Sequence, residues 1–212
     1  MTNKKEELRE ELDNILLTYE KPSTYFIKLK EENKLKNTFP EIYNLIGVIQ
    51  SPIHHPEGDV FTHTMMVIDE AAKLRDKAEN PLGFMYSALC HDFGKFLTTT
   101  TKEDGRIISY NHERAGLKLV DKFLSRIFKK EDYEMKNYIL NMSELHMQPN
   151  QLARQNSQLK STRKLFNKSI CPRDLVLLAK ADALGRSVDR DYSPSEEYLK
   201  NRLEDYLTWD RL

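Results

Sequence analysis

The stretch SALCHDFGKFLTT, residues Ser87–Thr99, puts two ionisable side chains together at the end of an apolar helical run. His91 and Asp92 directly follow the largely apolar residues Tyr86–Cys90. A buried histidine or aspartate costs free energy unless its polar atoms are satisfied. Either each side chain finds its own hydrogen-bond partner, or both bind the same group, and the rest of the chain distinguishes these alternatives.

Helical periodicity recurs on both sides of this stretch and predicts an all-α fold. PRDLVLLAKADALGR (172–186) is apolar enough to be a central helix. Apolar residues also repeat at helical spacing in FTHTMMVIDEAAKL (61–74), NHERAGLKLVDKFLSRIF (111–128) and DYEMKNYILNMSELH (132–146).

Two polar segments interrupt this pattern. Residues 98–110 are expected to form a loop with a short extended piece at Ile107 and Ile108. Residues 148–169 are expected to form a loop and one short helix. Asn111, which begins the next helical pattern, is of the type that caps a helix N-terminus with its side chain.

The length of 212 residues suits one domain with a single core. No shift in composition marks a domain boundary. We expect an N-terminal helix over residues 1–20 that packs on a domain over residues 21–190, with residues 191–212 as a C-terminal helix of the same domain.

Charge and cysteine content exclude several classes of protein. Lys plus Arg and Asp plus Glu both number 33, so the net charge is zero, whereas a protein that coats duplex DNA is clearly basic. Cys90 and Cys171 form no disulfide framework and suit a reducing compartment. The sequence shows neither a signal-peptide pattern nor an apolar stretch of about 20 residues. We therefore expect a cytoplasmic protein without a membrane span, and its oligomeric state stays open.

Six histidines and aspartates lie at the end of, or in register with, apolar helical stripes, so their side chains are expected to point inward. One such histidine alone is more often a hydrogen-bonded core residue than a metal ligand. Together, the six residues are poorly suited to a hydrophobic core, because each needs a polar partner that apolar neighbours do not supply. Histidine nitrogens and carboxylate oxygens without a thiolate suit Mn²⁺, Fe²⁺, Co²⁺, Ni²⁺ or Zn²⁺, so a metal site is predicted. The six are His63, His91, Asp92, His112, His146 and Asp182.

Structural interpretations stay open for some of these residues and their neighbours. His112 suits the first turn of a helix, and Asp182 is placed to pair with Arg186, four residues on, as an ordinary helix ion pair. His54 and His55, in the loop SPIHHPEGDV, are interpreted as surface or loop-packing residues.

Lys95 lies three residues after Asp92, and a cation so close to a divalent metal is unfavourable unless an anion also binds there. Phosphate fits this requirement. The alternative is a surface lysine whose ammonium group stays in water.

The order of these residues resembles that of the HD-domain metal-dependent phosphohydrolases. His63, the pair His91–Asp92 and Asp182 follow the order of that family, and His112 and His146 fall between them, as in members with two metals. More specifically, the chain resembles the HD domain of bacterial CCA-adding tRNA nucleotidyltransferases. The stretches that carry this likeness are FPEIYNLIGVIQSPIHHPEGDVFTHTMMVIDEAA (39–72), ALCHDFGKFLTT (88–99), NHERAGLKLV (111–120) and AKADALGR (179–186).

This resemblance covers residues 22–190 and implies a single HD-domain helical bundle over residues 21–190. It implies a phosphohydrolase of nucleotides or RNA ends, with 2′,3′-cyclic phosphodiesterase, 2′-nucleotidase or phosphatase activity. The implied mechanism is attack of a metal-activated hydroxide on phosphorus. Two divalent ions are implied, chosen from Mn, Ni, Fe, Co and Mg.

The resemblance also implies a role for each matching residue. One ion would be held by four residues and a second ion by three, with Asp92 shared between them. Two cations would face the substrate phosphate, and two carboxylates before the first ligand are candidates to shape the mouth of the pocket. The implied metal ligands are His63, His91, Asp92 and Asp182 for one ion and Asp92, His112 and His146 for the other. The implied catalytic residues are Asp92, Lys95 and Arg186. The implied substrate-binding residues are Lys95, Arg186, Glu57 and Asp59.

Motifs of related branches are missing from the sequence. It holds no Gly-Ser-rich turn followed by an Asp-x-Asp pair, so CCA addition is not expected of this chain. HDFGK is followed neither by the Gly-Tyr-Pro motif of the cyclic-di-GMP branch nor by the acidic pair of (p)ppGpp hydrolases. The alternatives are a non-catalytic HD-fold module that binds RNA or nucleotides, and a di-iron HD-type oxygenase. The substrate stays open among cyclic 2′,3′ ends, 2′-phosphates, 5′-nucleotides and dNTPs.

Overall fold

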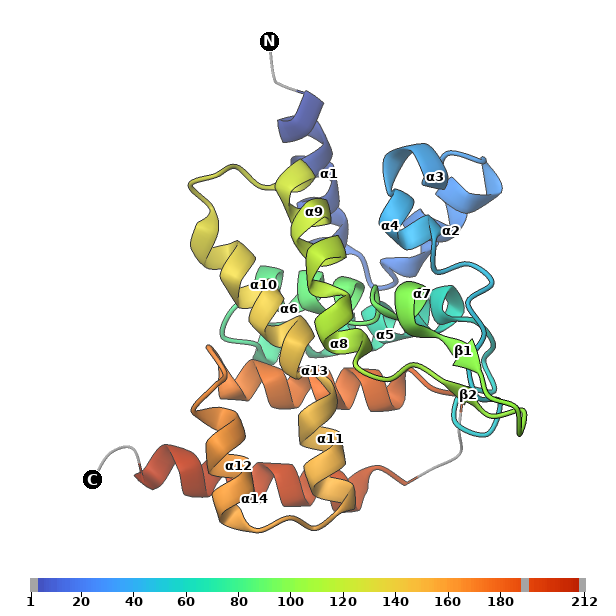
Figure 1. Ribbon diagram of the computed structural model, residues 1–212. Coiled ribbons are helices and arrows are strands. Elements are labelled where there is room, and N and C mark those ends of the chain that lie inside the picture. Colours follow the sequence, from blue (N-terminus) through green and yellow to red (C-terminus); the bar gives the residue numbers. More distant parts are fainter. Residues whose placement is uncertain (1–3, 188–190, 210–212) are drawn as a thin grey trace.

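The computed structural model describes residues 4–187 and 191–209, most of which lie in helices (Figure 1). The predicted all-α fold is confirmed, since the strands of this described part form only a two-stranded hairpin. The elements are α1 (Lys4–Thr18), α2 (Ser23–Glu31), α3 (Leu35–Thr38), α4 (Pro40–Tyr43), α5 (Val60–Leu74), the 3₁₀ turn η1 (Arg75–Lys77), α6 (Pro81–Cys90), α7 (Lys95–Thr98), β1 (Thr100–Thr101), β2 (Ile107–Ile108), α8 (His112–Ala115), α9 (Leu117–Ile127), α10 (Tyr133–Leu145), α11 (Met147–Arg154), α12 (Leu159–Phe166), α13 (Pro172–Leu184) and α14 (Ser193–Trp209).

Helix α6 lies at the centre of the fold, and every residue from Gly83 to Cys90 is buried. Its first residue is Pro81, whose missing N–H would have no partner in the first turn of a helix anyway. The side chain of Asn80 accepts a hydrogen bond from Gly83 N and so caps the same end. A helix that is apolar on all sides must be covered on all sides.

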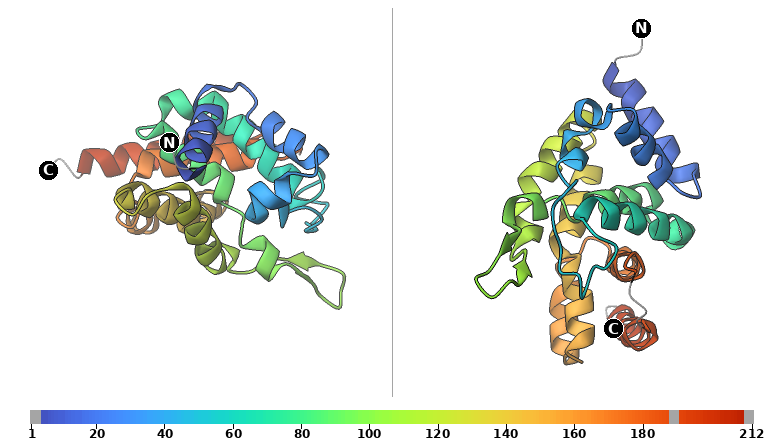
Figure 2. Two further views of the ribbon diagram at one scale, coloured as in Figure 1. Left: turned by 90° about the horizontal axis from the view of Figure 1, so that it is seen from above. Right: turned by 90° about the vertical axis from the view of Figure 1, so that its right-hand side faces the viewer.

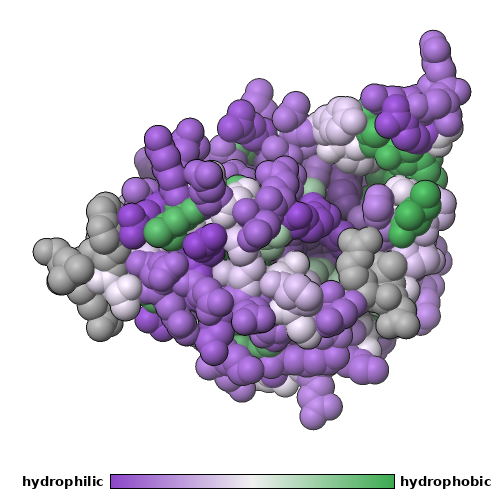
Figure 3. Space-filling view, turned by 90° about the horizontal axis from the view of Figure 1, so that it is seen from below, coloured by the Kyte–Doolittle hydropathy of each residue, from purple (hydrophilic) through white to green (hydrophobic). Residues whose placement is uncertain are grey.

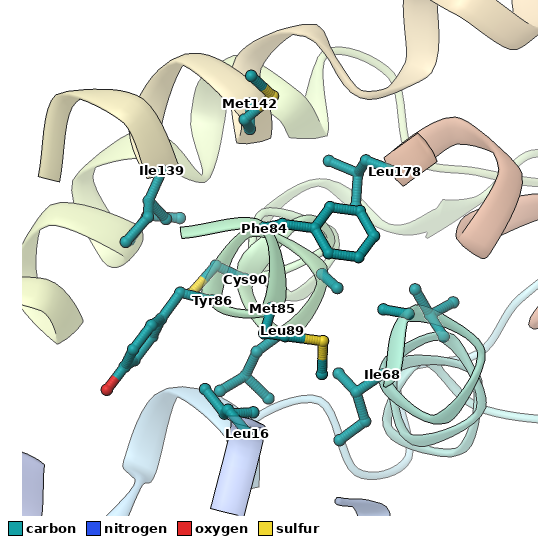
Figure 4. Packing of buried hydrophobic residues seen from close by; sticks show 14 of the residues in the cluster. Leu16, Ile68, Phe84, Met85, Tyr86, Leu89, Cys90, Ile139, Met142 and Leu178 are labelled. Atoms are coloured by element: carbon teal, nitrogen blue, oxygen red, sulfur yellow. The ribbon is translucent and has the colours of Figure 1, made fainter. Parts of the chain in front are cut away.

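Four longer helices, α1, α5, α10 and α13, supply that cover. Figure 4 shows Leu16 of α1, Ile68 of α5, Ile139 of α10 and Leu178 of α13 around the side chains of α6. Full burial of one such side chain contributes roughly 1.5–3 kcal/mol to the free energy of unfolding. The C-terminal end of α6, where His91 follows, is therefore held from several directions.

A short hairpin stands away from the helical body (Figure 2). Thr100 pairs with Ile108 and Thr101 with Ile107 in an antiparallel register, so the extended piece predicted at these isoleucines is confirmed. Gly105, with φ of 80°, lies in the tip of the hairpin, where a left-handed backbone suits glycine. The hairpin connects α7 to α8 and thereby precedes His112.

Two glycines bring the turn after α6 against α8 and α9. A Cβ atom placed on Gly94 would lie 1.9 Å from the carbonyl oxygen of His112, and one on Gly116 would lie 2.7 Å from Gly94 N. Real Cβ contacts are never so short, so only glycine allows this backbone approach. The approach fixes where His112 starts its helix relative to His91 and Asp92.

Two local predictions were wrong. Residues 148–169 lie largely in two helices, α11 and α12, because their few apolar residues, such as Leu165 and Phe166, are enough to bury one side of a polar segment. Asn111 precedes α8, but its side chain makes no capping hydrogen bond. Its backbone is left-handed, with φ of 56°, a conformation that asparagine tolerates better than most residues.

The terminal helices pack on the same core as the rest of the chain. Leu12 of α1 belongs to the buried cluster, and Leu203 and Tyr206 of α14 pack against it. This packing supports our proposal that residues 1–20, 21–190 and 191–212 form one domain; positions 1–3, 188–190 and 210–212 lie outside the described residues. Among the helices of the described part, none has the length and apolar character that crossing a membrane requires.

Candidate metal centre

The six predicted inward residues come from five separate places in the chain and meet in the interior. His63 lies in α5, His91 and Asp92 follow α6, His112 begins α8, His146 follows α10, and Asp182 lies in α13. All six are buried.

Hydrogen bonds to the backbone orient the four histidine rings. In each ring, Nδ1 faces a carbonyl oxygen, and because such an oxygen only accepts, the proton is assigned to Nδ1. Each Nε2 then carries a lone pair and points into the cluster. The Nδ1 contacts are His63 to Gly185 O at 3.2 Å, His91 to Ala88 O at 2.8 Å, His112 to Ser109 O at 2.8 Å and His146 to Ser143 O at 2.7 Å.

Asp92 lies between two pairs of these rings. Its Oδ1 atom is 3.1 Å from His112 Nε2 and 3.7 Å from His146 Nε2. Its Oδ2 atom is 3.2 Å from His91 Nε2 and 3.7 Å from His63 Nε2. The donor atoms therefore fall into two groups that share one carboxylate, and within each group they all lie within 4.8 Å of one another.

Three polar atoms at the centre of this cluster lack a regular hydrogen-bond partner in the protein. His91 Nε2 and both oxygens of Asp92 are buried without a hydrogen bond of acceptable geometry, although Lys95 Nζ lies 2.7 Å from Asp92 Oδ2. Nε2 of His112 and Nε2 of His146 are only 3.3 Å apart. More than nine in ten buried polar groups have a partner, so such a concentration of acceptors is a place that could hold a cation.

Asp174 shows how this fold treats a buried carboxylate that has a purely structural role. It accepts hydrogen bonds from Glu79 N, Asn80 N and the hydroxyl of Tyr138. Asp92 is equally buried, but apart from the Lys95 ammonium group its neighbours are histidine Nε2 atoms, whereas Asp174 accepts three regular hydrogen bonds. Imidazole nitrogens and carboxylate oxygens form a donor set that fits a first-row divalent metal ion.

Asp182 and Arg186 form the helix ion pair that the sequence allows, and they do so beside the cluster. Arg186 Nη2 lies 3.0 and 2.9 Å from the two oxygens of Asp182. The same carboxylate approaches His63 Nε2 at 3.1 Å through Oδ1. Burial alone would raise the pKa of Asp182, but Arg186 and His63 outweigh it and hold that pKa well below its usual range.

The charge states within the cluster follow from burial and from the neighbouring charges. Burial would raise the pKa of Asp92, yet His91 and Lys95 hold it well below its usual range, so the carboxylate is ionised. Burial, together with His91 and His112, lowers the pKa of His146 to about 3, so that ring is neutral at neutral pH. For His112, burial acts to lower the pKa, but Asp92 raises it above its ordinary value.

Lys95 is buried rather than a surface lysine. Its Nζ atom contacts Asp92 Oδ2 and donates a hydrogen bond to Gln50 Oε1, both at 2.7 Å. Gln50 is itself buried, and it was not predicted as a site residue.

Glu57 lies behind His63 and not at the mouth of a pocket. Its side chain is only 1% exposed, and Oε1 is 2.9 Å from His63 Nδ1 and 2.8 Å from His55 Nδ1. Its other oxygen accepts a hydrogen bond from Ser187 N. Hydrogen bonds from His63 and His55 overcome the effect of burial and lower the pKa of Glu57 to about 2.

The structure does not bring Asp59 into the cluster. Its Oδ1 atom accepts hydrogen bonds from the backbone N–H and the hydroxyl of Thr62, so Asp59 caps the N-terminus of α5. Its Oδ2 atom accepts a hydrogen bond from Gly47 N. Two carboxylates in one loop thus take different places because the chain turns between them at Gly58, with φ of 116°.

His55 reaches the site, although the sequence suggested a loop-packing residue. Its ring meets that of His63 edge-on, with centroids 4.7 Å apart. Burial and the nearby charge of Lys95 lower the pKa of His55 to about 3. Its position two residues before Glu57 was the only sequence signal for it.

A cleft of about 670 Å³ opens over the cluster. Figure 3 shows the underside of the molecule, which is mainly hydrophilic and is hollowed beside apolar groups on one side. The lining comprises Gln50, Ser51, His54, His55, Asp92, Lys95, Ile107, Ile108, Ser109, Tyr110, Asn111, His112, Glu113, Met147, Gln151, Arg154, Asp182 and Arg186. Asp92, Lys95, Asp182 and Arg186 are thus reachable from solvent, and the α11 side of the cleft was missed because that helix was expected to be a loop.

Comparison with known proteins gives one family and a consistent set of relatives. The model of the HD domain matches residues 60–187. A multifunctional CCA protein of Actinobacillus pleuropneumoniae is 34% identical over 185 residues, which are 82% of this chain and 43% of that protein. One of Mannheimia succiniciproducens is 32% identical over 189 residues, 84% of this chain and 43% of its own length. The chain therefore spans less than half the length of these relatives.

Proposed function

The chain belongs to the HD domain family, and on that premise we propose that it hydrolyses phosphoesters of nucleotides or RNA ends. HD domains form a family of metal-dependent phosphohydrolases. The observation that carries the proposal is the position of Asp92 between two pairs of histidine Nε2 atoms, with its oxygens lacking hydrogen bonds. The activity we propose is of the 2′,3′-cyclic phosphodiesterase, 2′-nucleotidase or phosphatase type.

Two sets of residues would hold the metal ions. Four side chains surround one position and three the other, with Asp92 common to both. Divalent ions there would polarise a phosphoryl oxygen and lower the pKa of a coordinated water. The first set is His63, His91, Asp92 and Asp182, and the second is Asp92, His112 and His146.

Lys95 and Arg186 are the groups that we expect to bind the phosphoryl oxygens of the substrate. Both line the cleft, and each is held by one carboxylate of the cluster, Asp92 or Asp182. Preorganised cations beside developing negative charge are a principal means of stabilising a phosphoryl-transfer transition state. Gln50 keeps the Lys95 ammonium group in the cleft.

Glu57 is proposed as a positioning residue for His63. With Gly185 O, it accepts the proton on His63 Nδ1 and thereby turns Nε2 towards Asp92. A carboxylate behind a metal-bound histidine fixes the tautomer of the ring and increases its basicity.

The relatives support the substrate class. They are named multifunctional CCA proteins, a name that refers to a nucleotide sequence, and this chain aligns with about two fifths of their length. We therefore propose a terminal ribose phosphate, cyclic or open, as the chemical group on which the chain acts.

Hydrolysis by the purified protein tests the proposal directly. We would assay 2′,3′-cyclic AMP, 2′-AMP, 3′-AMP and 5′-AMP with Mn²⁺, Ni²⁺, Co²⁺ or Mg²⁺, and measure phosphate release and oxygen uptake in parallel. Hydrolysis of at least one substrate that requires added metal is the expected result. Oxygen uptake without hydrolysis would indicate an oxygenase instead of a phosphohydrolase. Substrate binding without turnover would indicate a non-catalytic binding module.

A pair of aspartate variants makes this test specific. Asp92→Asn keeps the size of the side chain but removes the shared charge, so both bound metal and hydrolysis are expected to be lost. Asp121→Asn, at an exposed side chain of α9, is the matched control and is expected to behave like the natural protein. Full activity of a folded, metal-free Asp92→Asn protein would overturn the proposal.

A further inference from the structure

On the basis of the phosphohydrolase function proposed above, we propose that the hairpin side of the cleft binds the nucleobase of the substrate. The ring of Tyr110 would be the surface on which the base stacks. The chain would then select nucleoside phosphates over phosphate esters without a base.

The cleft has two chemically different sides. Its charged residues, such as Asp92, Lys95 and Arg186, come from the helices of the metal cluster. Its apolar lining near the hairpin consists of Ile107, Ile108 and Tyr110, and Met147 contributes from α11. A site with one charged and one apolar side matches a nucleoside phosphate, in which an anion and a flat aromatic base lie at opposite ends. The volume of about 670 Å³ is within the range of small-molecule sites, roughly 300–1,000 Å³.

Tyr110 offers an exposed aromatic ring within the cleft. It is 64% exposed, in contrast to Tyr86 and Tyr138, which are buried in the core. The ammonium group of Lys102 lies 5.4 Å from the centre of its ring, a cation–π contact that supports the ring from the hairpin. Stacking on such a ring tolerates any base, because every base has a π-face.

The backbone on both sides of Tyr110 is fixed. Before it, Ser109 binds the hydroxyl of Thr99 through Oγ at 2.7 Å and accepts from His112 Nδ1 through its carbonyl oxygen at 2.8 Å. After it, Asn111 has a left-handed backbone, with φ of 56°, that turns the chain into α8. The backbone that carries the ring is therefore placed in advance of binding, which reduces the entropy that binding would cost.

Tyr110 also lies close to the metal cluster along the chain. It precedes His112 by two residues, and two residues span at most about 7 Å. The ring therefore starts from a backbone position next to His112, whose Nε2 lies 3.1 Å from Asp92 Oδ1.

Steady-state kinetics on two substrates test the inference. With Mn²⁺ present, Tyr110→Ala is expected to raise KM for 2′-AMP by about 5- to 100-fold, the loss of one stacked base, with kcat little changed. KM for glycerol 2-phosphate, which has no base, should stay the same. Tyr110→Phe keeps the ring and should restore the natural KM for 2′-AMP.

Tyr133→Ala is the matched control. Tyr133 is 59% exposed, begins α10 and does not line the cleft, so its loss should change neither KM. An equal rise of KM for both substrates in Tyr110→Ala would assign Tyr110 a structural role and overturn the inference. An unchanged KM for 2′-AMP would overturn it as well.

Calorimetric titration separates this inference from the proposed function. If the natural protein hydrolyses neither ester, the phosphohydrolase proposal fails, but the Mn²⁺-loaded protein can still be titrated with 2′-AMP and with glycerol 2-phosphate. Tighter binding of 2′-AMP that Tyr110→Ala abolishes would still support the base site. Equal affinity for both ligands, or no binding of 2′-AMP, would reject it.

Discussion

The Nε2 atoms of His112 and His146 lie 3.3 Å apart, although Nδ1 of each ring already faces a backbone carbonyl oxygen. When both rings are neutral and carry their protons on Nδ1, their Nε2 lone pairs face each other across this short distance. Asp92 Oδ1, 3.1 Å from His112 Nε2, adds negative charge to the same buried space. The arrangement calls for a cation, and several testable consequences depend on it.

Metal removal is expected to destabilise the fold. A ligand that binds only the native state at 100 times its Kd adds about 2.7 kcal/mol to the free energy of unfolding. For a chain of this size, that corresponds to roughly 5–10 °C in Tm. Calorimetry after chelation with EDTA and after return of Mn²⁺ measures the difference, and an identical Tm in both states would contradict the prediction.

The two donor groups are expected to lose metal independently. His112→Ala removes one ligand of the second group and leaves the first group intact, so bound Mn²⁺ should fall from two ions per chain to one. Metal analysis by mass spectrometry measures this stoichiometry. His54→Ala, at an exposed histidine outside both groups, should keep two ions. One ion per chain in the natural protein would show that the second group holds none.

Glu57→Gln is expected to weaken metal binding at His63 without unfolding the protein. The amide keeps the size of the side chain but loses the charge that receives the His63 proton. Such a change behind a ligand typically costs 10- to 100-fold in metal affinity. Competition of Mn²⁺ with a fluorescent chelator gives the Kd, and an unchanged Kd would mean that Gly185 O alone is enough to orient the ring.

Asp59→Ala, two residues from Glu57, is expected to lower stability and to leave metal binding unchanged. Loss of the α5 cap should lower the free energy of unfolding by about 1 kcal/mol, within a usual range of roughly 0.5–2 kcal/mol. Metal affinity should stay unchanged, because the Asp59 side chain makes no contact with the cluster, and its backbone hydrogen bond with His63 N is kept in the variant. Urea unfolding measures the first quantity and chelator competition the second; a weaker metal Kd in Asp59→Ala would place this residue in the site after all.

Gly94→Ala is expected to disturb both stability and the second donor group. The added Cβ would lie 1.9 Å from His112 O, so the turn and α8 must separate, at a cost of roughly 3 kcal/mol or more. Gly47→Ala, whose Cβ would meet nothing within 4 Å, should cost only the strain of a left-handed backbone, about 1–2 kcal/mol. Urea unfolding with metal analysis compares them, and two bound ions in Gly94→Ala would contradict the prediction.

The sequence predicts burial for those candidate site residues that share a helical period with apolar neighbours. His63 and Asp182 lie on stripes whose other members are buried, so their inward direction follows from spacing alone. Gln50 and His55 could not be found in this way, because the segment between α4 and α5 has no period. There, position depends on turns such as the one at Gly58, and a sequence pattern does not specify where such a turn points.

Carboxylates in the same loop illustrate this limit. Glu57 and Asp59 look alike in the sequence, yet one accepts a proton from His63 and the other caps a helix. Asn111 illustrates the same limit. Its residue type suggested a side-chain cap for the following helix, but the structure shows a left-handed backbone and no capping hydrogen bond. The fold class, which depends on many residues at once, was predicted more reliably than any of these single contacts.

The contact between His63 and Asp182 has a consequence for how the protein is made. The two residues are 119 positions apart, so a growing chain carries the first ligand long before the last one is synthesised. Until α13 has left the ribosome, the set proposed for the first ion is incomplete and metal cannot lock the helices together. On the proposed ligand sets, loading of the first ion would therefore be a late event in biosynthesis, whereas the second set, Asp92, His112 and His146, is complete earlier in the chain.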